Sequence, residues 1–192
     1  MSPKPTEITI VGGGVVGLSV AMGLLQAGHA VQVLDGADSD ARASQGNFGL
    51  VWEQGKGWDF PPYARWTNDA LAAWPEFARS LTDLSGMDVA LDQSGGFEFF
   101  TDPDEMDEFA GMLAKQQDAL GNRFSHEILS GDVLRKQMAG IGDQVVGASF
   151  SKQDGHVNPL RLLRALRLSV HSAFATPRTL ELSLGDAPDP VF

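Results

Sequence analysis

The sequence predicts an α/β fold that begins with a parallel β-sheet and continues into an inserted α+β region. Two apolar runs at the start of the chain predict the sheet. Residues 8–11 are a short β-branched run that stops at three glycines, and residues 30–34 are a second run ending at Asp35. A helical pattern over residues 15–27 separates them. A strand–helix–strand order of this kind is typical of parallel strands covered by helices.

Each element of this strand–helix–strand unit is predicted by its own local sequence. The run at 8–11 is β-branched throughout and precedes a helical pattern, as a buried parallel strand does. Residues 15–27 are small or apolar on nearly every face, and Gly28 is placed to end that helix. The run at 30–34 completes the unit.

The middle of the chain predicts an α+β region. Its first expected elements are a helix over 63–84, which Pro75 kinks or splits, and a hairpin over 89–99. A second helix is expected to start after the capping residue Asp102. A short helix over 130–138, a strand over 145–150 and a helix opened by Asn158 and Pro159 should follow. The last helix carries its expected buried face on Leu160, Leu163, Leu166 and Val170.

Composition narrows the class of protein. The chain has 192 residues, a formal net charge of −11 and only 14 Lys and Arg, so nucleic acid and anionic membrane surfaces are not expected partners. It has no cysteine, no His/Asp/Glu cluster with metal-site spacing, and no apolar run near the ~20 residues of a transmembrane helix. The first residues lack the apolar core of a signal peptide. We expect a cytoplasmic protein.

The glycines after the first strand carry the chemistry. Gly12, Gly14 and Gly17 match the pattern G-x-G-x-x-G, in which the glycines allow a tight turn, close approach of the backbone to a pyrophosphate, and close helix–strand packing. The N–H groups of Val15 and Val16 at the start of the helix would then face the phosphates. Asp35 ends the second strand, where a carboxylate accepts hydrogen bonds from ribose hydroxyls and repels a 2′-phosphate. This pattern predicts a dinucleotide that is not NADP.

The next segment favours FAD over NAD. Residues 36–50 have no apolar helical repeat, and small residues let the backbone approach a flat ring. The apolar Phe48 and Leu50 argue against a mobile surface loop. With no cysteine and no histidine in the loop, we expect the FAD to be held non-covalently.

Four stretches resemble the D-amino-acid oxidase family of flavoproteins, which includes glycine oxidase, sarcosine oxidase and D-amino-acid dehydrogenases. They are residues 8–35, 43–44, 47–50 and 154–159, and the glycine oxidase and hydroxyproline dehydrogenase branch is the most similar. The resemblance implies FAD contacts at Val15 and Val16 (phosphates), Asp35 and Gly36 (ribose), Ala43 and Ser44 (pyrophosphate), and Phe48, Gly49 and Leu50 (flavin).

The resemblance also implies a division of the chain. Residues 1–60 would be the Rossmann-like FAD-binding part, 61–150 part of an inserted α+β substrate domain, and 151–174 a return to the FAD-binding domain. Family members are about twice as long, and residues 175–192 do not resemble them. We therefore expect a fold that is incomplete at its C-terminus and a chain that is a poor catalyst by itself.

The expected function is oxidation of the C–N bond of a small amino acid or cyclic amine, such as glycine, a D-amino acid or D-proline, to an imine. Oxygen or a quinone would accept the electrons, and assembly into an oligomer is a further expectation for this chain. The alternatives are an NAD-dependent dehydrogenase and a non-catalytic remnant or one chain of a split flavoenzyme. No catalytic residue is assigned, because the family's substrate-carboxylate arginines come from the half that is not matched.

Other polar and aromatic residues have simpler interpretations. Glu53 and Lys56 follow the flavin segment, and solvated positions are expected for both. A structural role is expected for His156 in the turn before the last helix. The helix arginines Arg161, Arg164 and Arg167 predict a solvated face, and the four tryptophans with Phe97, Phe99 and Phe100 are expected in the core.

Overall fold

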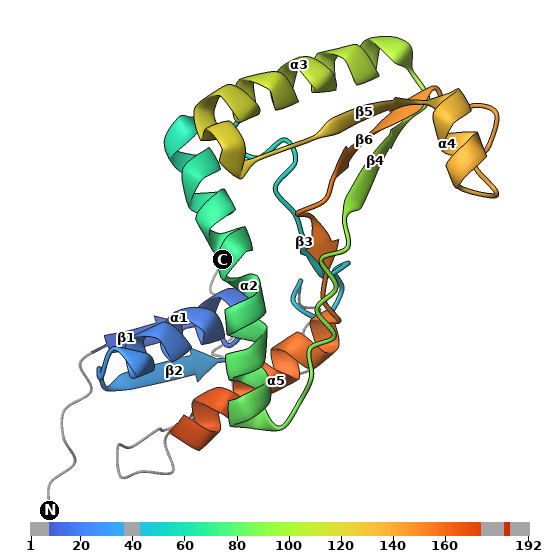
Figure 1. Ribbon diagram of the computed structural model, residues 1–192. Coiled ribbons are helices and arrows are strands. Elements are labelled where there is room, and N and C mark those ends of the chain that lie inside the picture. The colour runs from blue at the N-terminus through green and yellow to red at the C-terminus, as the bar shows by residue number, and fades with distance from the viewer. Residues whose placement is uncertain (1–7, 37–42, 174–182, 185–192) are drawn as a thin grey trace, which may run out of the picture. The chain divides into compact units, whose positions relative to one another are not determined.

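The computed structural model describes residues 8–36, 43–173 and 183–184 (Figure 1). The chain divides into two compact units. Unit 1 consists of Met1–Gly49, Glu76–Ala90 and Asn158–Phe192, and unit 2 of Leu50–Pro75 and Leu91–Val157. Each unit is described separately.

Unit 1 contains the predicted parallel sheet. β1 (Ile8–Val11) pairs in parallel with β2 (Val31–Asp35), from Ile8 opposite Val31 to Val11 opposite Leu34. The two-residue strand β8 (Ser183–Leu184) pairs with the end of β2, so the order is β1-β2-β8. The predicted strand–helix–strand unit is therefore confirmed. The rest of the atypical tail, 175–182 and 185–192, lies outside the described residues.

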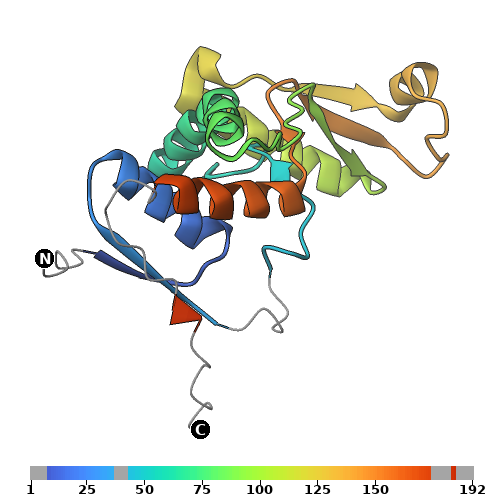
Figure 2. The ribbon, with the colours of Figure 1, turned by 90° about the horizontal axis from the view of Figure 1, so that it is seen from below.

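Two helices form the core of unit 1 with this sheet. α1 (Val15–Gln26) and α5 (Pro159–Ala173) lie side by side (Figure 2). The residues that they and β2 bury are Leu18, Ala21, Met22, Val31, Val33, Leu162, Leu163, Ala165, Leu166 and Val170. Leu160 departs from the prediction, because it is 58% exposed in the first turn of α5, before the helix reaches its packed face.

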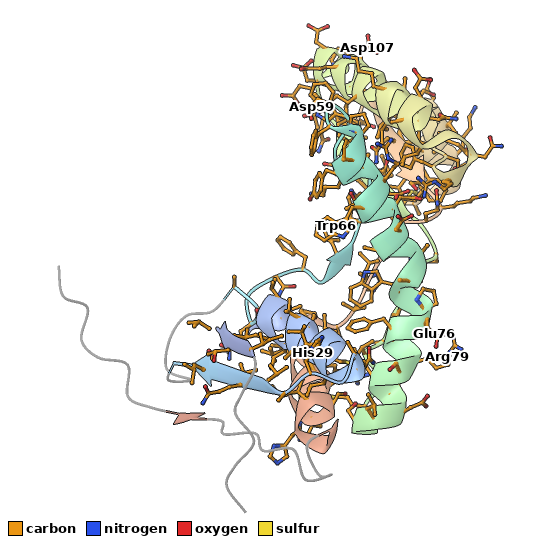
Figure 3. The ribbon with its side chains drawn as sticks, turned by 90° about the vertical axis from the view of Figure 1, so that its left-hand side faces the viewer. His29, Asp59, Trp66, Glu76, Arg79 and Asp107 are labelled. Carbon is orange, nitrogen blue, oxygen red and sulfur yellow. The ribbon has the colours of Figure 1, made fainter. Side chains whose placement is uncertain are left out.

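Pro75 was expected to kink or split the helix, and the split is wrong, because α2 (Pro61–Ser85) is a single long helix. It runs without interruption through Pro75. One missing N–H removes one backbone hydrogen bond, and the turns on both sides keep theirs, which is why no split occurs. Glu76 and Arg79 lie side by side on this helix as an exposed ion pair of 2.9 Å (Figure 3). Trp66, expected in the core, is instead 69% exposed on α2.

Unit 2 is built on an antiparallel sheet of β4 (Gly96–Phe100), β6 (Gly147–Ser151) and β5 (Glu127–Ser130), in the order β4-β6-β5. The predicted hairpin over 89–99 is wrong, because β4 pairs with β6 and residues 89–91 form no strand. Alternating apolar residues mark a strand but carry no information about its partner. In β4, Phe99 is 43% exposed although a core position was expected.

Helix α3 (Pro103–Leu120) lies along this sheet (Figure 1). It begins as predicted, since the Asp102 side chain accepts a hydrogen bond from the Asp104 N–H at 2.8 Å. A 3₁₀ turn η1 (Gly121–Arg123) follows, and α4 (Gly131–Gln137) follows β5 with Ser130 at its N-cap. The core cluster consists of Ala64, Leu113, Leu120 and Phe124, with Phe109 packed against it.

The remaining strand pair of unit 2 is short. β3 (Leu50–Val51) pairs antiparallel with β7 (Gly155–His156). Across the described part of the chain, none of the helices combines the length and the apolar character that a bilayer crossing requires. The functional division into FAD-binding and substrate parts stays a prediction.

Candidate functional site

The turn between β1 and α1 shows why its glycines are needed. Gly12 has a φ of +107°, a conformation that side chains disfavour, and its N–H donates to the Leu34 carbonyl at 2.7 Å. A Cβ on Gly17 would collide with the carbonyl oxygen of Gly12. The first and third motif glycines therefore hold helix and strand close together.

The start of α1 carries no acidic side chain. Gly14 is its N-cap, and the Val16 side chain is 78% exposed. The Ser44 Oγ accepts a hydrogen bond from the Val15 N–H at 3.0 Å, and a Cβ on Gly14 would lie 2.8 Å from that Oγ. Ser44 is thus placed at the positive end of the helix, where a phosphate is stabilised.

Asp35, the last residue of β2, lies against the same turn. A Cβ on Gly13 would approach the Asp35 Oδ2 to 2.5 Å, so only a glycine at 13 leaves room for the carboxylate. Sequence reasoning assigned no role to Gly13, although the run of three glycines was the signal. Gly36 follows Asp35 and is partly buried.

The segment after Ala43 is closed by one side chain. Asn47 donates from Nδ2 to the Ala43 carbonyl at 3.1 Å, and its Oδ1 accepts from the Gly49 N–H at 2.8 Å. Gly49 is buried with a φ of +69°, whereas the Phe48 side chain is 89% exposed. Asn47 lies in the stretch 47–50 that resembles the family but was not among the predicted site residues. The turn it forms presents Phe48 at the surface.

All the predicted site residues except Leu50 belong to unit 1. Leu50 begins unit 2, is 58% exposed and pairs with His156 across β3–β7. Within unit 1 the structure joins Ser44 to Val15 directly. His156 has the expected structural role, since its backbone also exchanges two hydrogen bonds with Asp92 at 2.8 Å.

Glu53 corrects a prediction. It is fully buried rather than solvated, while Lys56 is exposed as expected. Burial is the main cause that raises the pKa of Glu53 to about 7, against the hydrogen bond from Asn68 that lowers it. Burial also raises the pKa of Asp154, opposed by hydrogen bonds from Glu53 and Gln54. Two polar residues in a row resemble a solvated stretch, so the local sequence holds no signal of this burial.

No group of three or more His, Cys, Asp or Glu side chains among the described residues is arranged to hold a metal ion. The residues of the β1–α1 turn instead fit FAD. Added side chains at Gly13 and Gly14 would fill the space beside Asp35 and Ser44, and the helix start carries no competing acid. These are the requirements of a dinucleotide phosphate and ribose.

Comparison with known proteins decides the family. Residues 7–176 match the DAO family of FAD-dependent oxidoreductases. The chain belongs to this family. FAD is therefore its cofactor, and its relatives are oxidoreductases.

Among DAO-family relatives, a protein of Agrobacterium tumefaciens (strain Ach5) that forms part of an opine oxidase is 42% identical over 173 residues, covering 90% of this chain and 47% of the relative. Glycine oxidase of Bacillus licheniformis is 26% identical over 165 residues, with 84% and 42% covered. The chain thus spans about half the length of these relatives.

Solved DAO-family structures share the fold. Glycine oxidase from Bacillus cereus ATCC 14579 superposes with a TM-score of 0.74 at 26% identity, covering 93% of this chain and 46% of the other. Glycine oxidase from Geobacillus kaustophilus gives a TM-score of 0.76 at 22% identity, with 92% and 46% covered. The predicted α/β class with a Rossmann-like parallel sheet is confirmed.

Proposed function

We propose that this chain supplies the FAD-binding turn of an enzyme that oxidises a C–N bond of an amino acid or amine to an imine. The observation that carries the proposal is the turn at Gly12–Gly17, with Asp35 and Ser44 held against it. The similarity to the opine oxidase protein favours an opine as substrate, ahead of glycine, D-proline or another small amino acid.

Each side chain of the turn has a role that its contacts support. The Ser44 hydroxyl accepts from the Val15 N–H, so its own proton is left to donate to a pyrophosphate oxygen. The N–H of Val16 and the helix dipole add to that attraction. The Asp35 carboxylate accepts from ribose hydroxyls, and Phe48, Gly49 and Leu50 are proposed to border the flavin. FAD, when bound, supplies the acceptor for a hydride equivalent.

The protein's own contribution to the reaction is binding and orientation. No catalytic residue is assigned in this chain, which spans about half the length of its relatives. Oxygen or a quinone as electron acceptor, a cytoplasmic location and an oligomeric assembly are further parts of the proposal. An NAD-dependent dehydrogenase is not favoured, because the matched family uses FAD.

Reconstitution tests the proposal. The purified chain is mixed with FAD or NAD, and the flavin fluorescence and visible spectrum are followed. We expect FAD to bind and be released by denaturation, and NAD not to compete with it. Hydrogen peroxide and reduced-quinone assays with an opine, glycine, D-proline and sarcosine then test the substrate class. Binding of NAD with no spectral change for FAD would refute the proposal.

A further inference from the structure

The chain that leaves β3 is held by buried amide and carboxylate groups of unit 2. Gln116 on α3 donates from Nε2 to the Glu53 carbonyl at 2.8 Å and accepts from the Gly55 N–H at 3.0 Å. On the other side, Asp154 Oδ1 accepts from the Glu53 N–H at 2.7 Å. Gln116 and Asp154 are both fully buried. Residues 53–55 are therefore clamped through their backbone.

Gln54 extends the clamp to the antiparallel sheet. Its Nε2 donates to the second oxygen of Asp154 at 2.8 Å and to the Gly96 carbonyl at 3.2 Å. Its Oε1 accepts from the Ser149 hydroxyl at 2.7 Å. Both Asp154 oxygens are thus occupied by residues 53 and 54, which joins β4, β6 and the turn before β7.

The Glu53 carboxyl is the weak member of this cluster. Its Oε2 accepts from the Asn68 Nδ2 on α2 at 2.8 Å, but within the described residues its buried Oε1 has no hydrogen-bond partner. A buried carboxylate with one neutral donor is costly, whereas the neutral acid is tolerated.

The charged groups facing Glu53 act in opposite directions. Asp154 beside it raises the pKa of Glu53, and Arg123 of η1 lowers that pKa. Arg123 is also paired with Asp69 of α2 at 2.7 Å, and exposed Lys56 acts on Asp154. Desolvation is larger than these effects, so Glu53 changes charge near pH 7.

The strand pair that this cluster supports is short. β3–β7 contains two residue pairs, Leu50 with His156 and Val51 with Gly155. The clamped residues 53 and 54 follow β3 within three residues, and Asp154 immediately precedes β7. A two-residue ladder contributes little stability by itself, so its order depends on the cluster.

We propose that Glu53 is a positioning residue: as a neutral acid it keeps the clamp closed, and its ionisation loosens β3–β7 and residues 48–50, which directly precede the clamped chain. The effect on FAD rests on the proposed function, because it requires residues 48–50 to border the flavin. The loosening itself does not.

Hydrogen–deuterium exchange without FAD tests the loosening. Wild type, E53Q and the exposed β4 control E98Q are compared between about pH 5.5 and 8.5, with rates corrected for intrinsic exchange. Peptides covering 50–56 should exchange equally in wild type and E53Q at the low pH, and about tenfold faster in wild type at the high pH. E98Q should follow wild type. A ratio of wild type to E53Q that is constant across this range overturns the proposal.

A second variant keeps the test decisive if E53Q does not fold. N68A removes the hydrogen bond that lowers the pKa of Glu53, so the carbon-13 carboxyl titration of Glu53 should move to higher pH than in wild type. A Glu53 resonance that titrates in wild type near the ordinary glutamate value also overturns the proposal.

FAD affinity measured over the same pH range separates this inference from the proposed function. The dissociation constant of wild type should rise about tenfold between pH 6 and 8.5, and that of E53Q should stay flat. If both proteins bind FAD with one pH profile, the positioning role is overturned. If neither binds FAD at any pH, the proposed function fails, and the exchange result alone decides the clamp.

Discussion

At the scale of single residues, the glycines of the turn matter because their missing side chains leave room for neighbouring side chains. Gly13 allows Asp35 to lie against the β1–α1 turn, and Gly14 allows Ser44 to reach the first turn of α1. The same absence of Cβ atoms leaves the backbone accessible to a pyrophosphate. Substitutions at these residues should therefore affect FAD more than they affect folding elsewhere.

G14V should abolish FAD binding, because its side chain occupies the space beside Ser44 in which the pyrophosphate is expected. G23V is the matched control on α1, where Gly23 is exposed and an added Cβ meets no atom within 4 Å. Flavin fluorescence on protein whose circular dichroism is unchanged measures the effect. Equal FAD affinity in G14V and G23V would contradict the assignment of this turn.

D35A should weaken FAD binding by about 1.5–3 kcal/mol, the range for hydrogen bonds to a charged group. D107A, which removes an exposed carboxylate of α3, should leave the affinity unchanged. Titration of both variants with FAD at one ionic strength gives the comparison. An effect of the same size in both would mean that net charge, not the position of Asp35, is responsible.

The pKa of Glu53 makes the free energy of unfolding depend on pH. Because burial raises the pKa from 4.5 to about 7, the folded state holds this proton more tightly than the unfolded state does. Its contribution is complete below about pH 4.5 and is lost as the pH rises to about 7. The loss is about 3 kcal/mol at most. Urea unfolding should show this decrease in wild type relative to E53Q; parallel curves for the two proteins would show that Glu53 does not titrate in this range.

At the scale of elements, the interactions that end a helix are local in sequence, whereas those that pair a strand with its neighbour are not. Asp102 caps α3 through one short hydrogen bond within the same few residues. β4, in contrast, finds its partner β6 about fifty residues away, and not in the preceding chain. The effect of a single substitution on the free energy of unfolding is therefore easiest to predict at a helix boundary.

D102A should lower the free energy of unfolding by about 1 kcal/mol, because the Asp104 N–H loses its acceptor at the start of α3. D107A, in the second turn of the same helix, serves as the control for removing an acidic residue. Urea denaturation monitored by circular dichroism measures both. A cost in D107A equal to that in D102A would show that the cap contributes nothing specific.

At the scale of the whole molecule, the exposed apolar residues of unit 1 are the main feature. Val11, Val16 and Phe48 are 84%, 78% and 89% exposed, and all three belong to the turn or to the segments beside it. Large exposed apolar side chains are typical of surfaces that contact a ligand or further protein. Because the chain spans about half the length of its relatives, its stability should depend strongly on what it binds.

FAD should therefore raise the melting temperature of the chain. At a FAD concentration of 100 times the dissociation constant, the gain is about 2.7 kcal/mol, or roughly 5–10 °C for a chain of this size. Riboflavin is the control, because it lacks the phosphates and the ribose of adenosine that the turn is proposed to bind. Differential scanning fluorimetry with FAD, riboflavin and NAD measures this; a shift with riboflavin as large as with FAD would remove the turn from the binding site.

The sequence by itself determined the parallel β1–β2 pair, the glycine turn, α1 and the start of α3. For the turn and for the start of α3, the signal and the structure lie within a few residues, as with Gly12 and Gly17 or Asp102 and Asp104. The parallel pairing of β1 with β2 followed from the strand–helix–strand order of the sequence. The glycines at fixed spacing predicted a dinucleotide turn. The family was predicted from the resemblance of four separate stretches of the sequence, and its match over residues 7–176 confirms it.

The tertiary structure alone decided the pairing of β4 with β6 and the burial of Glu53. The alternating pattern of a strand is the same for any partner strand. The sequence alone therefore could not exclude residues 89–91 as the partner of β4. Glu53 is fully buried, and its hydrogen-bond partners Asn68, Gln116 and Asp154 come from distant parts of the chain. Whether a carboxyl group is solvated or buried depends on what surrounds it in space, and one-dimensional spacing does not contain that information.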